Sequence, residues 1–130
     1  MEKVRIAVVG LGTVGQSVHL PILSKIPEVE IVAVCDLEAA KAEFVAKKYE
    51  IPRYYTDLQE MLKTEENVIG IDICTSTFNH LDAAVAALDA KKHVLVEKPL
   101  ARTYDEALKI VNAAKKNQRK VMVGMNNRFR

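Results

Sequence analysis

The sequence predicts an α/β protein with a doubly wound parallel sheet of six strands in the order 3-2-1-4-5-6. Six short apolar segments of strand type alternate with segments of helical periodicity along the 130 residues, which is the pattern of such a sheet. The first strand runs into Gly10, Gly12 and Gly15, spaced G-x-G-x-x-G, and a helical pattern follows them. No linker or low-complexity tract interrupts the pattern, so residues 1–130 are expected to form one domain.

Local patterns justify the elements in order. The first strand is apolar on both faces, as a central parallel strand is, and Pro21 is expected to end or kink the helix after the glycines. Thr56 suits the N-cap of the third helix, the fourth helix is alanine-rich and suited to lie on a sheet, and Thr103 with Glu106 forms a capping box for the fifth. The predicted strands are residues 4–9, 29–35, 52–55, 68–74, 93–96 and 120–124. The predicted helices are residues 13–25, 38–49, 57–62, 81–90 and 103–116.

The composition excludes several classes of partner. Apolar residues make up 49% of the chain and charged residues 28%, which is ordinary for a globular protein. A formal net charge of +2, with basic residues spread along the chain, argues against nucleic acid as a partner. The longest apolar runs are strand-sized, so we expect no membrane span. Because the start of the chain runs directly into a strand, we also expect no signal peptide.

The two cysteines, Cys35 and Cys74, each close a predicted strand. In the predicted order these strands flank the first strand, so the two thiols should lie about 9–10 Å apart. A disulfide needs a shorter separation, so both thiols are expected to be free, which fits a cytoplasmic location. No Cys or His stands at ligand spacing in the sequence, so we predict no metal site.

The segment Gly10-Leu11-Gly12-Thr13-Val14-Gly15 predicts a dinucleotide-binding loop of the Rossmann type. Gly10 makes the turn out of the strand, Gly12 leaves room for the backbone to approach a pyrophosphate, and Gly15 lets the helix pack closely on the strand. The N-terminus of the helix offers unpaired N–H groups and partial positive charge to the diphosphate. The alternative interpretation is a chance glycine turn in another α/β fold.

Asp36 follows the second strand, 26 residues after Gly10. A carboxylate at this point can hydrogen-bond both ribose hydroxyls of an adenosine, and it repels the 2′-phosphate of NADP. Leu37 and Glu38 come next and the first cation is Lys41, so NAD is favoured over NADP. Asp36 can also cap the following helix, and both roles are compatible because a carboxylate has two oxygens.

Glu97-Lys98-Pro99 follows the fifth strand, at the strand end where ligands bind in open α/β sheets. Lys98 is therefore expected near the nicotinamide end of a bound cofactor, where an ammonium can hydrogen-bond a substrate hydroxyl and help to move its proton. The alternative for Lys98 is an ordinary solvated loop lysine. Pro99 stiffens the turn and is a candidate for a cis peptide bond.

The chain resembles the glucose–fructose oxidoreductase and inositol dehydrogenase family (Gfo/Idh/MocA) over nearly its whole length. Residues 92–99, KHVLVEKP, resemble the family signature G-K-H-V-x-x-E-K-P, and the glycine loop matches that of the family. His80 lies 17 residues before Glu97, as the family spacing expects. Further agreement with family motifs is found in residues 19–21, 32–36, 75–80 and 121–129.

This resemblance implies a role for each matching residue. Lys98 would be the catalytic lysine that contacts the substrate and the nicotinamide ribose, and Glu97 would contact the nicotinamide side of the cofactor. For His80 two interpretations stay open, namely a contact with the cofactor or a helix-start residue that bonds local backbone. The other implied cofactor contacts are Thr75 and Ser76 along the adenosine and ribose path, and Asn126 and Arg128 near the nicotinamide.

Two residues depart from the family motifs, and two histidines are expected to have structural roles. Ser76 stands where the family often has proline, which loosens the turn without abolishing binding. Lys91 stands where glycine is common, and we expect this difference to be neutral. We interpret His19 and His93 as structural residues.

Members of the family are more than twice this length, and their second domain binds the substrate and supplies an acid/base pair. The resemblance therefore implies the NAD(P)-binding domain of an oxidoreductase that acts on a sugar, cyclitol or related hydroxyl compound by hydride transfer. This chain is expected to bind the cofactor without turnover, and the full-length protein to form a homo-oligomer. A non-catalytic dinucleotide sensor or regulator is the alternative, since a few relatives have given up catalysis.

Overall fold

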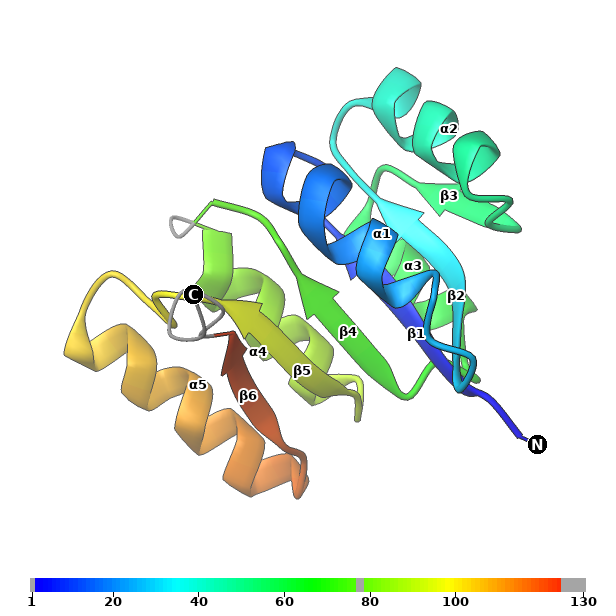
Figure 1. Cartoon of the computed structure of the whole chain (residues 1–130). Helices are drawn as coiled ribbons and strands as arrows, with labels where there is room; N and C mark the ends of the chain where they lie inside the picture. Colours follow the sequence, from blue (N-terminus) through cyan, green and yellow to red (C-terminus); the bar gives the residue numbers. More distant parts are fainter. Residues whose placement is uncertain (1, 77–78, 125–130) are drawn as a thin grey trace.

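The computed structural model describes residues 2–76 and 79–124. It contains a six-stranded sheet with parallel neighbours in the order β3-β2-β1-β4-β5-β6, which confirms the predicted fold class (Figure 1). The strands are β1 (Val4–Val9), β2 (Val29–Cys35), β3 (Arg53–Tyr55), β4 (Gly70–Ile73), β5 (His93–Glu97) and β6 (Val121–Gly124). The helices are the π-helical η1 (Gly15–His19), α1 (Leu20–Leu23), α2 (Ala39–Lys48), α3 (Leu58–Thr64), α4 (His80–Asp89) and α5 (Tyr104–Asn117).

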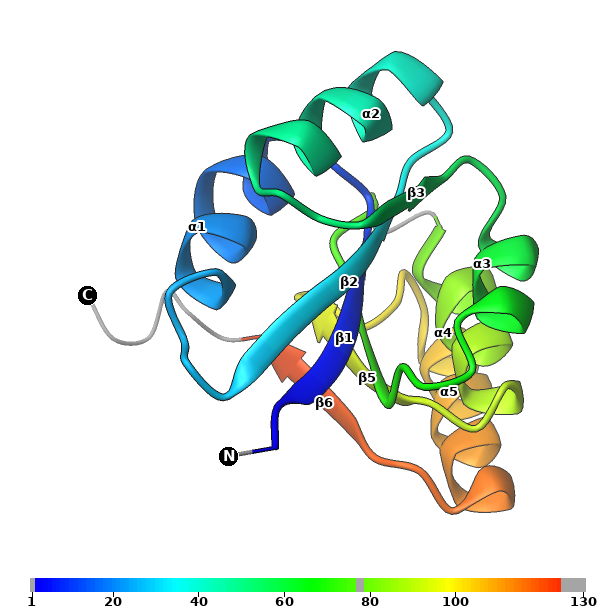
Figure 2. The ribbon, with the colours of Figure 1, turned by 90° about the vertical axis from the view of Figure 1, so that its right-hand side faces the viewer.

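Helices cover both faces of the sheet, with α1 and α2 on one face and α3, α4 and α5 on the other (Figure 2). Successive side chains of a strand point to opposite faces, so β1 supplies both halves of the core. Val8 packs in the cluster under α1 and α2, whereas Ala7 and Val9 pack in the larger cluster under α4 and α5. This two-sided burial explains why β1 is apolar at successive positions.

Because all the strands are parallel, their carboxyl ends meet at one edge of the sheet, which we call the carboxyl edge. The chain passes from β1 outward to β2 and β3, and then from β4 outward to β5 and β6 on the other side of β1. The boundary between β1 and β4 is therefore the topological switch point, where ligands bind in sheets of this kind. No helix within residues 2–76 and 79–124 is long and apolar enough to cross a membrane.

Two helix starts differ from the predictions in a definable way. The N-cap of α3 is Asp57 rather than Thr56, since the Asp57 carboxylate accepts the Gln59 N–H at 3.2 Å. A carboxylate is an equally good cap and also favours the positive end of the helix dipole. At α5, the Thr103 hydroxyl accepts the Glu106 N–H as predicted, but the Glu106 carboxylate accepts the N–H of Arg102 instead of that of Thr103.

The helix after the glycine loop contains a π-turn. Residues 13–14 are α-helical, residues 15–19 are π-helical, and the Leu20 N–H donates to Gly15 O. Pro21 has no N–H and its ring crowds the carbonyl four residues earlier, so the wider turn just before it accommodates the proline. The helix then continues only to Leu23, two residues short of the predicted end.

Lys91 adopts a left-handed backbone with φ of 67°. This conformation favours glycine and costs a residue with a Cβ about 1–2 kcal/mol. The glycine that is common in relatives therefore has a structural reason, and the prediction of a neutral difference at Lys91 was wrong. The Lys91 ammonium donates to Asn117 Oδ1 at 2.7 Å, which offsets part of that cost.

Candidate functional site

The glycine loop begins at the end of β1 and lies against the start of the loop after β4. Gly10 has φ of +91°, and a Cβ built on it would lie 2.6 Å from Thr75 N. A Cβ on Gly15 would lie 2.6 Å from Gly10 O. The structure therefore agrees with the predicted turn at Gly10 and with close packing of the helix at Gly15, because neither position has room for a side chain.

Gly12 differs from the other two loop glycines. It is exposed, and no atom lies within 4 Å of a Cβ built on it. The open space belongs to a cavity of about 460 Å³ at the carboxyl edge. The predicted site residues that line this cavity are Gly10, Leu11, Gly12, Asp36, Thr75 and Ser76.

Two predicted loop residues, Thr13 and Val14, form the first helical turn beyond Gly12. Both are exposed and lie outside the cavity lining. The N–H groups of a first helical turn have no intrahelical acceptors. The arrangement therefore leaves polar backbone beside the open surface of Gly12, as an anion site at a helix N-terminus needs.

Asp36 uses both carboxylate oxygens to organise the loop around it. The Leu11 N–H donates to Oδ2 at 2.8 Å, and the Glu38 N–H donates to Oδ1 at 2.9 Å. The first bond joins Asp36 to the glycine loop, and the second is a local turn bond two residues along the chain. The N-cap of α2 is Glu38, and no side chain in the described part of the chain caps this helix, so the expectation that Asp36 caps it was wrong. Each oxygen has a second lone pair for a further donor such as a ribose hydroxyl.

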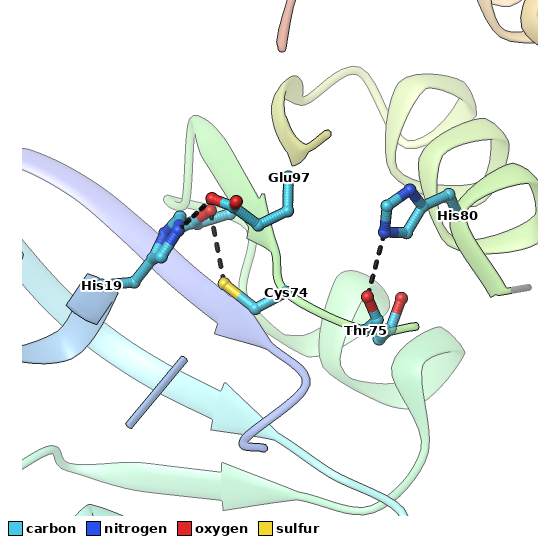
Figure 3. Close-up of polar contacts among 6 residues, drawn as sticks. His19, Cys74, Thr75, His80 and Glu97 are labelled. Atoms are coloured by element: carbon cyan, nitrogen blue, oxygen red, sulfur yellow. Dashed lines mark hydrogen bonds and ion pairs between the residues drawn. The ribbon is translucent and has the colours of Figure 1, made fainter. Parts of the chain in front are cut away.

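His80 begins α4 and is 1% exposed. Its Nε2 lies 3.0 Å from Thr75 O (Figure 3). Its Nδ1 lies 2.9 Å from Pro99 O. Of the two open interpretations, this geometry supports the backbone-bonding one, since both ring nitrogens already face carbonyl oxygens. His80 thereby ties the loop after β4 to the loop after β5.

The loop after β5 contains the predicted catalytic lysine. Lys98 is exposed, and its peptide bond to Pro99 is cis, as the sequence allowed. Within residues 2–76 and 79–124, no side chain pairs with the Lys98 ammonium. Asn126 and Arg128 lie outside the described residues.

A buried polar cluster at the β5 end of this edge was missed by the sequence analysis. His19, at the end of η1, places Nδ1 2.6 Å from Asp72 Oδ2 on β4 and Nε2 2.5 Å from Glu97 Oε2 on β5 (Figure 3). The hydrogen bond that His19 donates to Asp72, together with the bond to Glu97 and the charges of both carboxylates, outweighs burial and raises the pKa of His19 to about 9. We call His19, Asp72 and Glu97 the imidazolium cluster.

Cys74 lies beside the imidazolium cluster, with Sγ 3.7 Å from Asp72 Oδ1. Burial first, and the neighbouring carboxylates second, raise the pKa of this thiol, as burial does for Cys35, whose pKa rises to about 11. Both thiols are free and stay protonated near neutral pH. One ligand-type atom each from His19, Asp72 and Cys74 lie within 4.8 Å of one another. Hydrogen bonds already account for this grouping, so we assign no metal site to it.

The raised pKa of His19 predicts a loss of stability at alkaline pH. A group whose pKa rises on folding stabilises the fold fully below its unfolded value of 6.5, and this contribution disappears as the pH rises to about 9. We expect the free energy of unfolding to fall by about 3 kcal/mol across this range. Urea titrations at pH 6.5 and 9.5 measure the difference. His19→Gln should lose less stability over the same interval, and an equal loss in the variant would contradict the assignment to His19.

Fold and site together define a dinucleotide-binding α/β domain: a glycine loop on the switch point, an acid after β2, and a cavity between them. Residues 4–125 match the family model described as oxidoreductase family, NAD-binding Rossmann fold. The chain belongs to this Gfo/Idh/MocA family of oxidoreductases and corresponds to its N-terminal NAD-binding domain.

Named relatives agree with this assignment. The chain is 36% identical over 124 residues to inositol 2-dehydrogenase of Salmonella typhimurium, covering 94% of this chain and 37% of that protein. It is 38% identical to 4-carboxy-2-hydroxymuconate-6-semialdehyde dehydrogenase of a Sphingobium species, covering 96% of this chain and 39% of that protein. The WlbA dehydrogenase of Chromobacterium violaceum, solved with NADH and UDP-GlcNAcA, superposes with a TM-score of 0.93 at 27% identity, covering 99% of this chain and 37% of that one. The chain thus spans little more than a third of each relative.

Proposed function

We propose that this chain binds NAD along the carboxyl edge and serves as the cofactor-binding part of an oxidoreductase. The adenosine half would lie in the cavity between the glycine loop and Asp36, with Thr75 and Ser76 on its other side. The diphosphate would sit over Gly12 at the N-terminus of the helix. The observation that carries this proposal is the open surface at Gly12, since Gly10 and Gly15 are closed by the protein itself and Gly12 is not.

The surroundings of Asp36 favour NAD over NADP. A 2′-phosphate on the adenosine ribose would approach the carboxylates of Asp36 and Glu38. Lys41 also lines the cavity, but its ammonium is paired with Glu38 Oε2 at 2.8 Å. The Glu38 contact and the charge of Asp36 raise the pKa of Lys41. The Lys41 ammonium is therefore already neutralised by Glu38 and Asp36, so it would bind a phosphate group weakly.

The nicotinamide half would cross the switch point toward the end of β5. Glu97 would contact the nicotinamide, and Lys98 would contact the ribose and the substrate hydroxyl. The exposure of Lys98 supports this role, because an ammonium that pairs with no side chain in the described part of the chain can donate to a ligand. His80 would act behind the surface, by joining the loops that contain Thr75 and Lys98.

The substrate class proposed for the whole protein is a sugar, cyclitol or related hydroxyl compound, oxidised or reduced by hydride transfer. Two named relatives are inositol 2-dehydrogenase and 4-carboxy-2-hydroxymuconate-6-semialdehyde dehydrogenase, and this chain spans little more than a third of their length. Hydride transfer needs a substrate held against the nicotinamide, so we expect this chain to bind NAD without turning over a substrate. A non-catalytic sensor is the second candidate, and Lys98 favours the enzyme, because a sensor does not need that ammonium.

Thermal denaturation with each cofactor tests the proposal. Binding to the folded state alone stabilises it by about 2.7 kcal/mol when the ligand is at 100 times its Kd. We expect NAD to raise the melting temperature by roughly 5–10 °C at such a concentration and NADP to raise it less at equal concentration. A melting temperature unchanged by both cofactors would refute dinucleotide binding, and an equal rise with both would refute the preference for NAD.

A further inference from the structure

The imidazolium cluster joins three separate elements at the carboxyl edge. The side chains of His19, Asp72 and Glu97 are 10%, 4% and 16% exposed, so water competes little for their hydrogen bonds. Among the residues that the structure describes, the groups that face the imidazole are the two carboxylates and, beyond Asp72, the Cys74 thiol. Within residues 2–76 and 79–124, these side chains therefore form a small, largely buried set of charges beside the loop that contains Lys98.

The hydrogen bonds define the charge of the imidazole. Carboxylates only accept hydrogen bonds, and an imidazole donates from both ring nitrogens only as the imidazolium. His19 faces a carboxylate on each side, at 2.6 and 2.5 Å, and its pKa of about 9 agrees with a proton on both nitrogens. Near neutral pH the cluster then holds one positive and two negative charges.

The same contacts fix Glu97. Its Oε2 accepts from His19, and a Cβ on the neighbouring Gly124 would lie 3.1 Å from that oxygen, so the carboxylate packs directly over the glycine backbone. In the described part of the chain, no residue bonds the second oxygen, Oε1. His19 thus fixes the Glu97 carboxylate through Oε2 and leaves Oε1 available to a ligand. Glu97 directly precedes Lys98 in the sequence.

We propose that His19 is a positioning residue for the nicotinamide end of the site, where its positive charge limits the preference of the protein for oxidised over reduced cofactor. The proposal rests on the proposed binding of NAD. The oxidised nicotinamide ring has a positive charge and the reduced ring has none. A cluster with net charge −1 favours the oxidised ring modestly, and a cluster without the imidazolium charge, at −2, favours it more.

The ratio of the Kd of NADH to the Kd of NAD⁺ tests this proposal. Isothermal titrations of the chain with each cofactor at pH 7 should show a ratio about threefold to tenfold higher in His19→Gln than in the parent, as one added unit of charge imbalance implies. In the parent, the ratio of the Kd of NADH to the Kd of NAD⁺ should also rise between pH 7 and pH 10, because His19 loses its proton over this range. The variant should show no such rise, because burial keeps the Cys74 thiol protonated.

Two further variants separate charge from structure. Asp72→Asn removes one negative charge behind His19, so at pH 6 it should lower the ratio. His93→Gln, at the amino end of β5, should leave the ratio at the parental value.

Equal losses of affinity for both cofactors in His19→Gln, or a pH-independent ratio in the parent, would overturn the proposal and leave His19 a purely structural residue. If His19→Gln does not fold, the pH series of the parent decides. Failure of the parent to bind either cofactor would overturn the proposed function itself, which is a distinct result.

Discussion

Gly10→Ala is expected to lower the free energy of unfolding by roughly 3–5 kcal/mol, or to prevent folding altogether. The φ of +91° disfavours any residue with a Cβ, and the new methyl group would meet Thr75 N at 2.6 Å and the carbonyl carbon of Cys74 at 2.8 Å. Both are backbone atoms next to the central strand β4, so they cannot move aside at low cost. Urea denaturation followed by circular dichroism measures the loss.

Gly12→Ala is the matched control for this prediction. No atom lies within 4 Å of the added methyl group, so the free energy of unfolding should stay within about 1 kcal/mol of the parental value. Its affinity for NAD should nevertheless fall at least about tenfold, since the methyl group would occupy the space proposed for the diphosphate. A Gly12→Ala variant that binds NAD as tightly as the parent would show that the diphosphate does not sit over this residue.

Asp36→Arg is expected to reverse the cofactor preference. The substitution replaces a carboxylate that repels the 2′-phosphate with a guanidinium that binds phosphate with two parallel hydrogen bonds. We expect the ratio of NADP to NAD affinity to rise by roughly 100-fold, or about 2.7 kcal/mol. Fluorescence titrations with both reduced cofactors measure the two affinities.

The absolute affinities of this variant should also fall, because Asp36 holds Leu11 N–H and Glu38 N–H. Asp36→Asn keeps one acceptor oxygen without the charge and provides the control. It should relax the preference without reversing it. If the relative affinity for NADP does not improve in Asp36→Arg, then Asp36 does not select the cofactor.

Fold class and strand order were predictable because they depend on local hydrophobic periodicity and on the glycine motif, which stands between a strand and a helix in folds of this kind. The six strands and their order are confirmed. The differences arise where local alternatives are nearly equal in energy. Asp57 and Thr56 are both competent caps, and only the path of the chain between β3 and α3 decides between them. The left-handed backbone at Lys91 was hidden because a lysine in the sequence gives no sign of it.

The site divides in the same way. The glycine loop and Asp36 follow from short-range patterns, and the structure brings them together around one cavity. The imidazolium cluster joins residues that are 53 and 78 positions apart, which no local pattern indicates. One signal was present: Asp72 stands in the middle of an apolar strand, and a buried carboxylate requires a partner.

The π-turn between Gly15 and His19 has a consequence for helical phase. An α-helix advances by about 100° per residue, and a π-turn inserts one residue, so the faces before and after it are displaced by roughly that angle. Gly15 packs against Gly10 O, just after β1, with one phase, and His19 meets Asp72 and Glu97 with the other. One short helix thereby contacts both halves of the sheet, since its beginning packs on the glycine loop after β1 and its end reaches β4 and β5.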